Sequence, residues 1–457
     1  MIITNPRYQE QALKSMCWVA VSGDTSYPPV TTSDGTRYNK TAMLVYDLTK
    51  AQVNGSAFGD NASSDAFGRL RVSQPVSLID AKQLYGKGVN IFDEVVTANA
   101  TSVHVSGDSL VNMTTNANGA YVIRQTPLRF NYQPGKGIVG LFTGVFAPET
   151  NITKRVGLFQ SGSVAPYNPN SGIYLEVTSA GPRFVVLKTE GTAYSVSVPQ
   201  SAWNVDKLDG TGPSGLAIDF TKAQILTMDY EWLGVGRVRF GFYLEGKCYY
   251  AHYVTNLNSL NSTYLSSPNH PIRYEIRQTG AGSGSMKHIC SSVIIEGNED
   301  ILGTPASVST SASVTVNTLA FHPVLSVRLN PAQPDIVPLL RSVDLLNASN
   351  NGSCVYKLVY NAEVSGTAPT WADLVGTPFQ YAIGANTAIL TAGTDLLTKF
   401  IGASQRAGIS TDEASVGGLN GRFGVKINGT PENITIAAKG ITNDAVIWAS
   451  MNVIQRA

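Results

Sequence analysis

Residues 237–254 read RVRFGFYL, then EGK, then CYYAHYV. Both outer runs are rich in aromatic and β-branched residues, and Gly246 lies in the short run between them. A glycine in a tight loop between two such runs is typical of a β-hairpin. The stretch therefore predicts two antiparallel strands joined by a turn.

Strand-forming runs continue on both sides of this hairpin. Residues 172–187 predict two strands around Ala180-Gly181-Pro182, and residues 192–198 alternate apolar and polar side chains with period two. Further strands are predicted at 138–146, 225–232, 273–277 and 289–296. Many short strands separated by Gly, Asn and Pro turns, with no alternation of strands and long helices, indicate a β-sandwich or jelly roll.

The 457 residues are too many for one ordinary core. We predict an all-β chain with an N-terminal arm or anchoring segment at 1–75, a jelly-roll-like β-sandwich domain at 76–305 and a smaller C-terminal β-sandwich domain at 306–457. The alternative for the first region is a small domain of its own.

Three local features refine this division. Residues 8–20 predict one short helix within the otherwise polar N-terminal region. Residues 304–318 are rich in Ser, Thr and Ala and predict either a connector or an edge strand. Residues 338–346 are compatible with a helical turn.

Composition excludes several classes of partner. Only 14% of residues are charged, against about 25% in a typical protein, and such a surface suits contacts between subunits. The net charge is +1 and the 33 basic residues form no dense cluster, so we expect no nucleic-acid partner. The N-terminus lacks the apolar core of a signal peptide, and no apolar run approaches about 18 residues, so we expect no membrane insertion.

No motif predicts catalysis, a cofactor or a bound metal. The HExxH and GxSxG patterns are absent, and the GxxxxGK spacing at 241–247 lies in strand sequence and is followed by Cys248 rather than Ser or Thr. The five histidines are scattered, and the cysteines form no CxxC pair and are expected to be reduced. We therefore predict a non-enzyme, although glycosidase carboxylates can lie far apart in a sequence.

Aromatic and arginine side chains are the remaining functional signal. Trp203 and Tyr250 are candidates for stacking on sugar rings, and the alternative is a place in the core or in a subunit interface. Arg237 and Arg239 alternate along one predicted strand, as do the arginines of 273–277. We expect them on a solvated face, with a subunit contact as the second hypothesis and a sulfate or sugar-acid site as the third.

Residues 65–73 read DAFGRLRVS and residues 229–242 read DYEWLGVGRVRFGF. These strings resemble motifs of a family of tailed-bacteriophage virion structural proteins that is common in aquatic phages. Shorter matches continue the resemblance at 130–136, 209–216, 271–277 and 289–294. The motif residues in this chain are Asp65, Phe67, Gly68, Arg69, Arg71, Trp232, Gly234 and Gly236. The resemblance covers about 65–296 closely and the C-terminal part loosely, and it does not include the first 64 residues.

The resemblance implies a structural component of the virion, assembled in the bacterial host cytoplasm, with no catalytic residues. We expect a capsid- or tail-attached decoration or fibre protein whose N-terminal arm binds other virion proteins. A homo-oligomer, specifically a trimer, follows from the general habit of phage appendages. The alternative is a receptor-recognition protein that binds host surface glycans, and a depolymerase is disfavoured because no fixed-period repeat is visible.

Overall fold

The computed structural model describes residues 30–31, 37–38, 62–297, 302–409 and 421–456. The described residues fall into two compact units: one contains Ser64 and Gly68–Leu70, and the other contains Asp65–Phe67 and continues from Arg71. In the first unit, β1 (Val30–Thr31) pairs antiparallel with β2 (Arg37–Tyr38). The predicted helix at 8–20 and most of the predicted arm lie outside the described residues.

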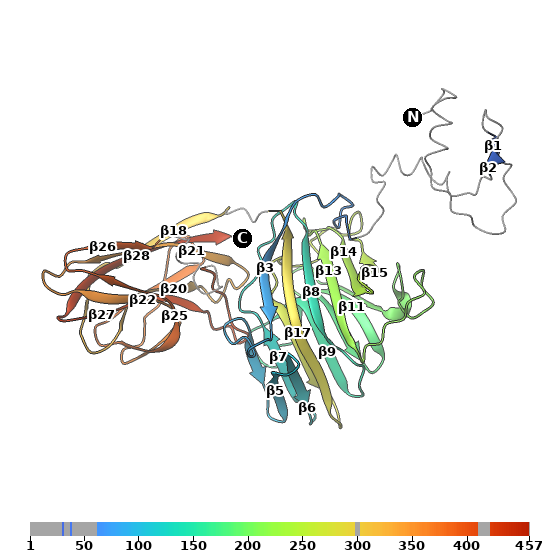
Figure 1. Ribbon diagram of the computed structural model, residues 1–457, viewed down its shortest axis with the longest axis horizontal. Helices are drawn as coiled ribbons and strands as arrows, with labels where there is room; N and C mark the ends of the chain where they lie inside the picture. Colours follow the sequence, from blue (N-terminus) through green and yellow to red (C-terminus); the bar gives the residue numbers. More distant parts are fainter. Residues whose placement is uncertain (1–29, 32–36, 39–61, 298–301, 410–420, 457) are drawn as a thin grey trace. The chain divides into compact units, whose positions relative to one another are not determined.

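The second unit confirms the predicted all-β class (Figure 1). Strands β3 to β17 form two antiparallel sheets. The seven-stranded sheet has the order β12 (Tyr194–Pro199), β11 (Gly181–Lys188), β10 (Pro169–Thr178), β9 (Ile152–Ser161), β16 (Ile272–Gln278), β7 (Tyr121–Gln125), β4 (Asp93–Val96). The eight-stranded sheet has the order β15 (Lys247–Val254), β14 (Val238–Leu244), β13 (Ala223–Tyr230), β8 (Ile138–Val145), β17 (Gly284–Glu296), β6 (Leu110–Thr115), β5 (Ala100–Val105), with β3 (Pro75–Lys82) also paired to β17.

The hairpin predicted from residues 237–254 is confirmed as β14 and β15. Leu244 lies opposite Lys247, so the loop contains only two residues. Those residues, Glu245 and Gly246, both have positive φ, at 50° and 77°. Positive φ at both positions defines the type I′ turn, whose twist matches that of the flanking strands. The Gly246 of the sequence pattern therefore has the predicted role.

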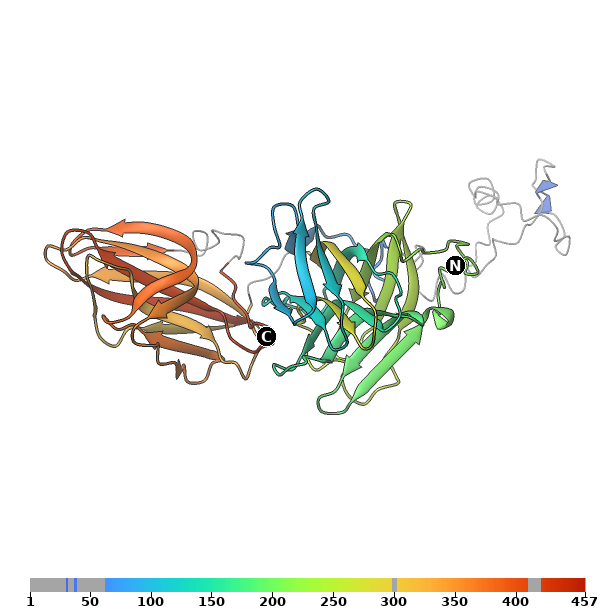
Figure 2. The same cartoon turned by 90° about the horizontal axis from the view of Figure 1, so that it is seen from below.

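The core of this sandwich lies between the two sheets (Figure 2). Aromatic side chains join the layers: the Phe184 ring of β11 lies 4.4 Å from the Phe240 ring of β14 and 4.4 Å from the ring of Trp203. Trp203 follows a short 3-10 helix, Gln200–Ala202. The alternation of inward and outward residues places the apolar side chains of both sheets against one another, which stabilises the sandwich by burial.

Strands β18 to β28 form two further sheets around a second core. The five-stranded sheet contains β18 (Thr304–Ser309), β28 (Ala445–Arg456), β21 (Val337–Asn347) and β26 (Arg406–Ile409) in that order, with β19 (Val314–Val316) also paired to β28. The six-stranded sheet has the order β23 (Ala372–Asp373), β24 (Phe379–Ile383), β20 (His322–Leu329), β27 (Asn433–Gly440), β22 (Cys354–Ser365), β25 (Ile389–Ile401).

The strands around this second core test the predictions for residues 338–346 and 304–318. The helical turn predicted at 338–346 is wrong, because that segment lies within β21, where Val343 and Leu345 point into the core at a spacing of two. The Ser- and Thr-rich segment 304–318 contains β18 and β19, so the edge-strand alternative is correct for most of it. No helix among the described residues is long and apolar enough to cross a membrane.

Candidate functional site

The two main motif strings meet on the outer face of the eight-stranded sheet. Asp229 near the end of β13 lies opposite Arg239 of β14, and their side chains form an ion pair with no exposed surface on either. The Arg71 Nη2 donates a hydrogen bond of 2.7 Å to Asp229 Oδ2 from 158 residues away in the sequence. One buried carboxylate therefore joins both motifs.

Aromatic rings complete this cluster. The Tyr250 hydroxyl of β15 donates to Asp229 Oδ2 at 2.8 Å, and the Arg239 guanidinium lies 4.3 Å from the centre of the Tyr250 ring. Arg237 donates from Nε to the Ala66 carbonyl at 2.7 Å and lies 4.9 Å from the Tyr253 ring. We call Arg71, Asp229, Arg239 and Tyr250 the Asp229 cluster. The cluster holds Arg71 against the sheet, and Arg237 beside it holds Ala66 there.

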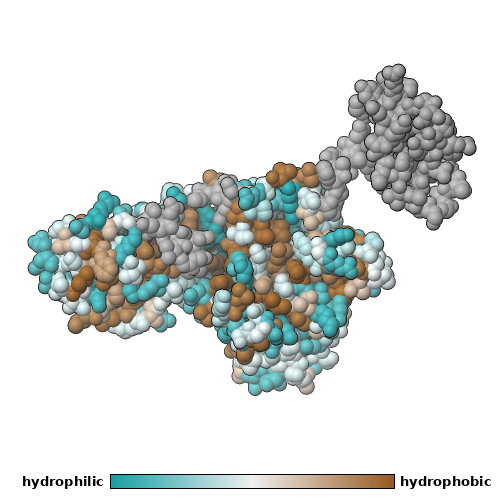
Figure 3. Space-filling view, in the orientation of Figure 1, coloured by the Kyte–Doolittle hydropathy of each residue, from teal (hydrophilic) through white to brown (hydrophobic). Residues whose placement is uncertain are grey.

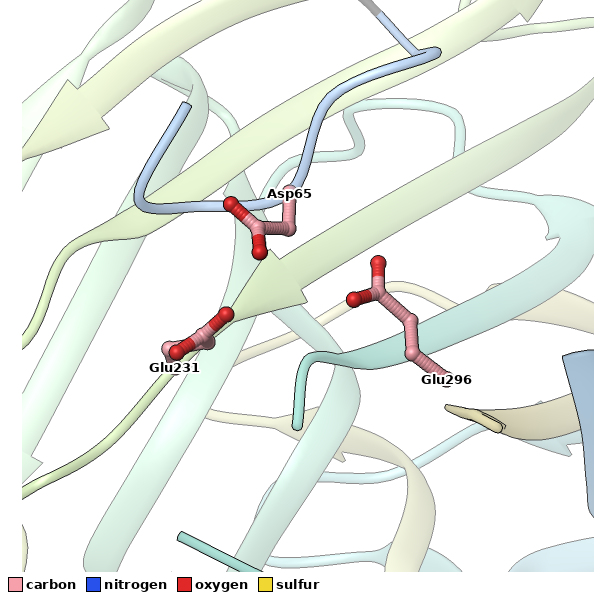
Figure 4. A group of neighbouring side chains, drawn as sticks. All are labelled: Asp65, Glu231 and Glu296. Atoms are coloured by element: carbon pink, nitrogen blue, oxygen red, sulfur yellow. The ribbon is translucent and has the colours of Figure 1, made fainter. Parts of the chain in front are cut away.

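Three further carboxylates lie beside the Asp229 cluster. Asp65, Glu231 and Glu296 converge so that one oxygen from each lies within 4.8 Å of the others (Figure 4). Carboxylate oxygens are ligands that Ca²⁺ accepts, and no other described His, Cys, Asp or Glu residues form such a group of three. Arg71 pairs with Glu296 and so places a positive charge beside the group. Burial raises the pKa of Glu296, although Arg71 opposes that shift.

Acidic residues that lie close together do not by themselves define a metal site. Here the arginine supplied by the first motif is already bound to Glu296, so the arrangement is suited to fixing Arg71 beside the sheet. We assign no metal role to it, and the predicted absence of metal ligands stays a prediction.

The remaining motif residues shape turns and packing around this cluster. Gly234 follows Leu233 in a turn where both have positive φ, at 80° and 36°. A Cβ on Gly236 would lie 1.8 Å from the Glu231 carbonyl oxygen, so only glycine fits there. The half-buried Trp232 makes an edge contact with Tyr132 at 6.1 Å. In contrast, Phe67 and Arg69 are exposed and Gly68 has a φ of 79°.

The prediction that Trp203 and Tyr250 are exposed aromatics for sugar stacking is wrong. Trp203 is 3% exposed and Tyr250 is 7% exposed. Trp203 packs on Phe184 and donates from Nε1 to the Val198 carbonyl at 3.2 Å, while Tyr250 belongs to the Asp229 cluster. The alternative hypothesis, in which these aromatics lie in the core of the protein, is therefore correct for both.

The predicted solvated arginine faces are also wrong in part. Arg239 and Arg273 have fully buried side chains, and Arg237 is half-buried. On the outer face of the seven-stranded sheet, Arg273 and Arg277 of β16 both bind Glu275 between them. Alternation correctly placed these arginines on one face, but it did not reveal that the face is covered.

Glu275 is the centre of this second ionic cluster. Arg155 of β9 donates from Nη1 to Glu275 at 2.6 Å and from Nε to Glu176 of β10 at 2.7 Å. Burial opposes ionisation of Glu275, but Arg273, Arg155 and Arg277 together outweigh it and lower its pKa to about 2. A retaining or inverting glycosidase requires one carboxyl group with a raised pKa as its proton donor. Glu275 is unsuited to that role.

A buried serine–histidine contact is likewise unsuited to nucleophilic catalysis. His288 Nε2 lies 3.2 Å from Ser291 Oγ, and His288 Nδ1 lies 3.2 Å from Arg124 Nε. An arginine only donates hydrogen bonds, so Nδ1 is the acceptor and Nε2 carries the proton. His288 therefore donates to Ser291 and has no lone pair available to remove its hydroxyl proton. Both side chains are buried.

Together, the fold and these contacts define an all-β sandwich protein whose motif residues form internal ion pairs. No family model and no curated protein matches the chain. Similar solved structures include the Emp47p carbohydrate recognition domain, with 12% identity, 48% of this chain and 95% of that chain covered, and a TM-score of 0.30. A Bacillus licheniformis β-glucanase has 8% identity, with 50% and 98% covered and a TM-score of 0.30. A legume lectin-like domain from Entamoeba histolytica has 14% identity, with 49% and 99% covered and the same TM-score. A likeness at this level carries no information about function.

Substituting Asp229 is expected to destabilise the chain strongly. Asp229→Asn keeps the shape of the side chain but removes the buried negative charge that Arg239 and Arg71 bind, and we expect a loss of about 3–5 kcal/mol in the free energy of unfolding. Asp395→Asn is the matched control, because Asp395 pairs with Lys357 at the surface and its loss is expected to change stability by about 0–1 kcal/mol. Urea denaturation measures both, and equal effects of the two substitutions would contradict the assigned role of Asp229.

The Glu275 cluster predicts a specific pH dependence. The folded-state pKa of Glu275, about 2, lies below its unfolded value, so its ion pairs contribute full stability above the unfolded value of about 4.3. That contribution is lost as the pH falls through about 2. The stability difference between the natural chain and Glu275→Gln is therefore expected to shrink between pH 5 and pH 2, measured by urea denaturation. Glu363→Gln, at an exposed position of β22, is the control with no expected difference; a Glu275→Gln difference that stays constant over this range would refute the assignment.

Proposed function

We propose that this chain is a non-enzymatic structural component of a tailed-phage virion, displayed on the particle and attached through its N-terminal region. The observation that carries the proposal is the use of the motif residues. Arg71 and Asp229, together with Arg237 and Arg239, come from the two strings that resemble virion structural proteins, and they bind one another or the backbone. Side chains that bind one another or the backbone stabilise the fold. This use of the motif residues supports a structural protein rather than an enzyme.

The composition of the surface supports contacts with neighbouring subunits. Only 14% of the residues are charged, and hydrophilic and hydrophobic residues both occur across the face visible in Figure 3. Surfaces with few charges lose little hydration free energy when they are covered by another subunit. The proposed partners are other virion proteins and further copies of this chain, with a trimer as the specific hypothesis.

The cysteines are consistent with assembly in a reducing cytoplasm. Cys248, Cys290 and Cys354 are free thiols. Burial raises the pKa of Cys248 and of Cys354 to about 11, which keeps both thiols protonated and unreactive near neutral pH. Such thiols are compatible with the proposed origin of the protein in the bacterial host cytoplasm.

Glycan recognition by the displayed chain is the second candidate function. The aromatics first considered for it, Trp203 and Tyr250, are buried and cannot receive a sugar ring. A different tryptophan favours this candidate: Trp448 of β28 is 39% exposed on the outer face of the five-stranded sheet. An exposed indole ring on a flat sheet is a surface on which the apolar face of a sugar can stack.

The virion proposal is tested by particle composition. We expect the tagged full-length chain, produced in an infected host, to co-purify with phage particles through a density gradient. A chain of residues 65–457 keeps every residue of the Asp229 cluster, so it is expected to fold with an unchanged unfolding midpoint but to stay out of the particles.

The two outcomes that contradict this expectation are distinct. Absence of the full-length chain from purified particles would overturn the virion function. Equal incorporation of the 65–457 chain would overturn only the attaching role of the N-terminal region. Mass spectrometry of the gradient fractions distinguishes these results.

A further inference from the structure

The outer face of the five-stranded sheet carries an unusual pair of apolar side chains. Along β28 the residues Ile447, Ala449 and Met451 are buried in the core, while Trp448 between them points to the opposite side. Trp448 lies directly across from Leu346 of β21. Trp448 is 39% exposed and Leu346 is 44% exposed, so the two side chains form a small apolar platform on the sheet. We call this side of the sheet the Trp448 face.

Short polar side chains flank the platform along the same strands. Further along β28, Ser450 lies opposite Asp344, and Asn452 lies opposite Ser342, to which its Nδ2 donates at 2.8 Å. On the other side of β28, Ser309 of β18 lies opposite Ser450. Hydroxyl and amide groups in these positions can donate to and accept from the hydroxyl groups of a ligand beside the indole ring.

The rest of the Ser- and Thr-rich segment extends this polar border. Ser307 lies opposite Asn452, and Thr315 of β19 lies opposite Val446. Ser307, Ser309 and Thr315 are all exposed. The segment that the sequence marked only as a connector or edge strand therefore supplies a row of hydroxyl groups to the Trp448 face.

The described residues beside the platform include one pair of opposite charges. Arg406 of β26 lies opposite Leu346, and its Nη2 binds Asp344 Oδ1 at 3.2 Å. The two side chains are 73% and 35% exposed, so both remain accessible to a ligand. One positive and one negative group cancel, which favours an uncharged ligand over an acidic or basic one.

The exposed apolar area of the platform fits a sugar ring better than a second copy of the chain. Trp448 and Leu346 together expose on the order of 150 Å² of side chain, whereas a stable protein interface buries about 800 Å² on each partner. The apolar area is comparable with one face of a single sugar ring. Its border of hydroxyl, amide and ionic groups matches the hydroxyl groups at the rim of such a ring.

We propose that the Trp448 face is a binding site for a neutral hexose unit of a surface polysaccharide. Trp448 stacks on the apolar face of the sugar, Leu346 extends that contact, and the Asp344–Arg406 pair and Asn452 bind the sugar hydroxyl groups. The site lies in the C-terminal sheets, outside the region that carries the virion motifs. This inference rests on the second candidate function and does not depend on the virion role.

The test is affinity electrophoresis of the full-length chain in gels that contain dextran, mannan, galactan or, as a charged comparison, alginate. We expect at least one neutral polysaccharide to retard the chain. Trp448→Ala is expected to raise the apparent dissociation constant about fivefold or more, because the stacking contact is lost. Phe400→Ala is the matched control: Phe400 is 74% exposed on β25 of the other sheet, and its loss is expected to leave retardation unchanged.

Three results of the electrophoresis would overturn the inference. They are retardation by none of the neutral polysaccharides, retardation by alginate alone, and equal retardation of the natural chain and a Trp448→Ala variant with an unchanged unfolding midpoint. A change in sedimentation coefficient on Trp448→Ala would also overturn it and would identify the face as a subunit contact. Incorporation into particles is measured separately, so failure here leaves the virion proposal standing.

Discussion

A charged carboxylate without exposed surface constrains the sandwich more than any single apolar contact. Asp229 lies on the outer face of the eight-stranded sheet, where one carboxylate would ordinarily be hydrated. Removal of its water costs several kcal/mol unless ionic and hydrogen-bonding partners replace it. Arg239, Tyr250 and Arg71 are those partners. Because Arg71 comes from a distant segment, the ion pairs fix the position of Arg71 on the sheet.

The sequence was sufficient to predict many of the strands. It did not predict the contacts that bury the outward-facing arginines. The two runs of aromatic and β-branched residues and Gly246 were sufficient for the β14–β15 hairpin, because both express local backbone preferences. Period-two alternation placed Arg239 and Arg273 on outward faces, where solvent was expected. Burial of those arginines depends on segments far away in the chain, such as Arg71 for Asp229, and no local pattern encodes that contact. The error at residues 338–346 was different, since Val343 and Leu345 are core residues at the spacing of two that is typical of a strand.

At the candidate sites too, the sequence predicted local features but not the contacts between distant segments. The two motif strings were identifiable from their order in the sequence, but the contact of Arg71 with Asp229, which joins them, was visible only in three dimensions. Trp448 lies in β28, and its exposure depends on the core-facing positions of Ile447 and Ala449 on either side. The chain thus buries the ionic groups around Asp229 and Glu275, where they join distant segments, and leaves a small apolar platform exposed on the C-terminal sheets.

Arg71 and Asp229 are expected to act as one structural unit, and a double-mutant cycle measures whether they do. The unfolding free energies of the natural chain, Arg71→Ala, Asp229→Asn and the double variant give the coupling energy between the two side chains. The account predicts a coupling above about 1 kcal/mol, because removing either partner already destroys the interaction. Losses that add to within about 0.5 kcal/mol would show that the two residues act independently, and would contradict the account.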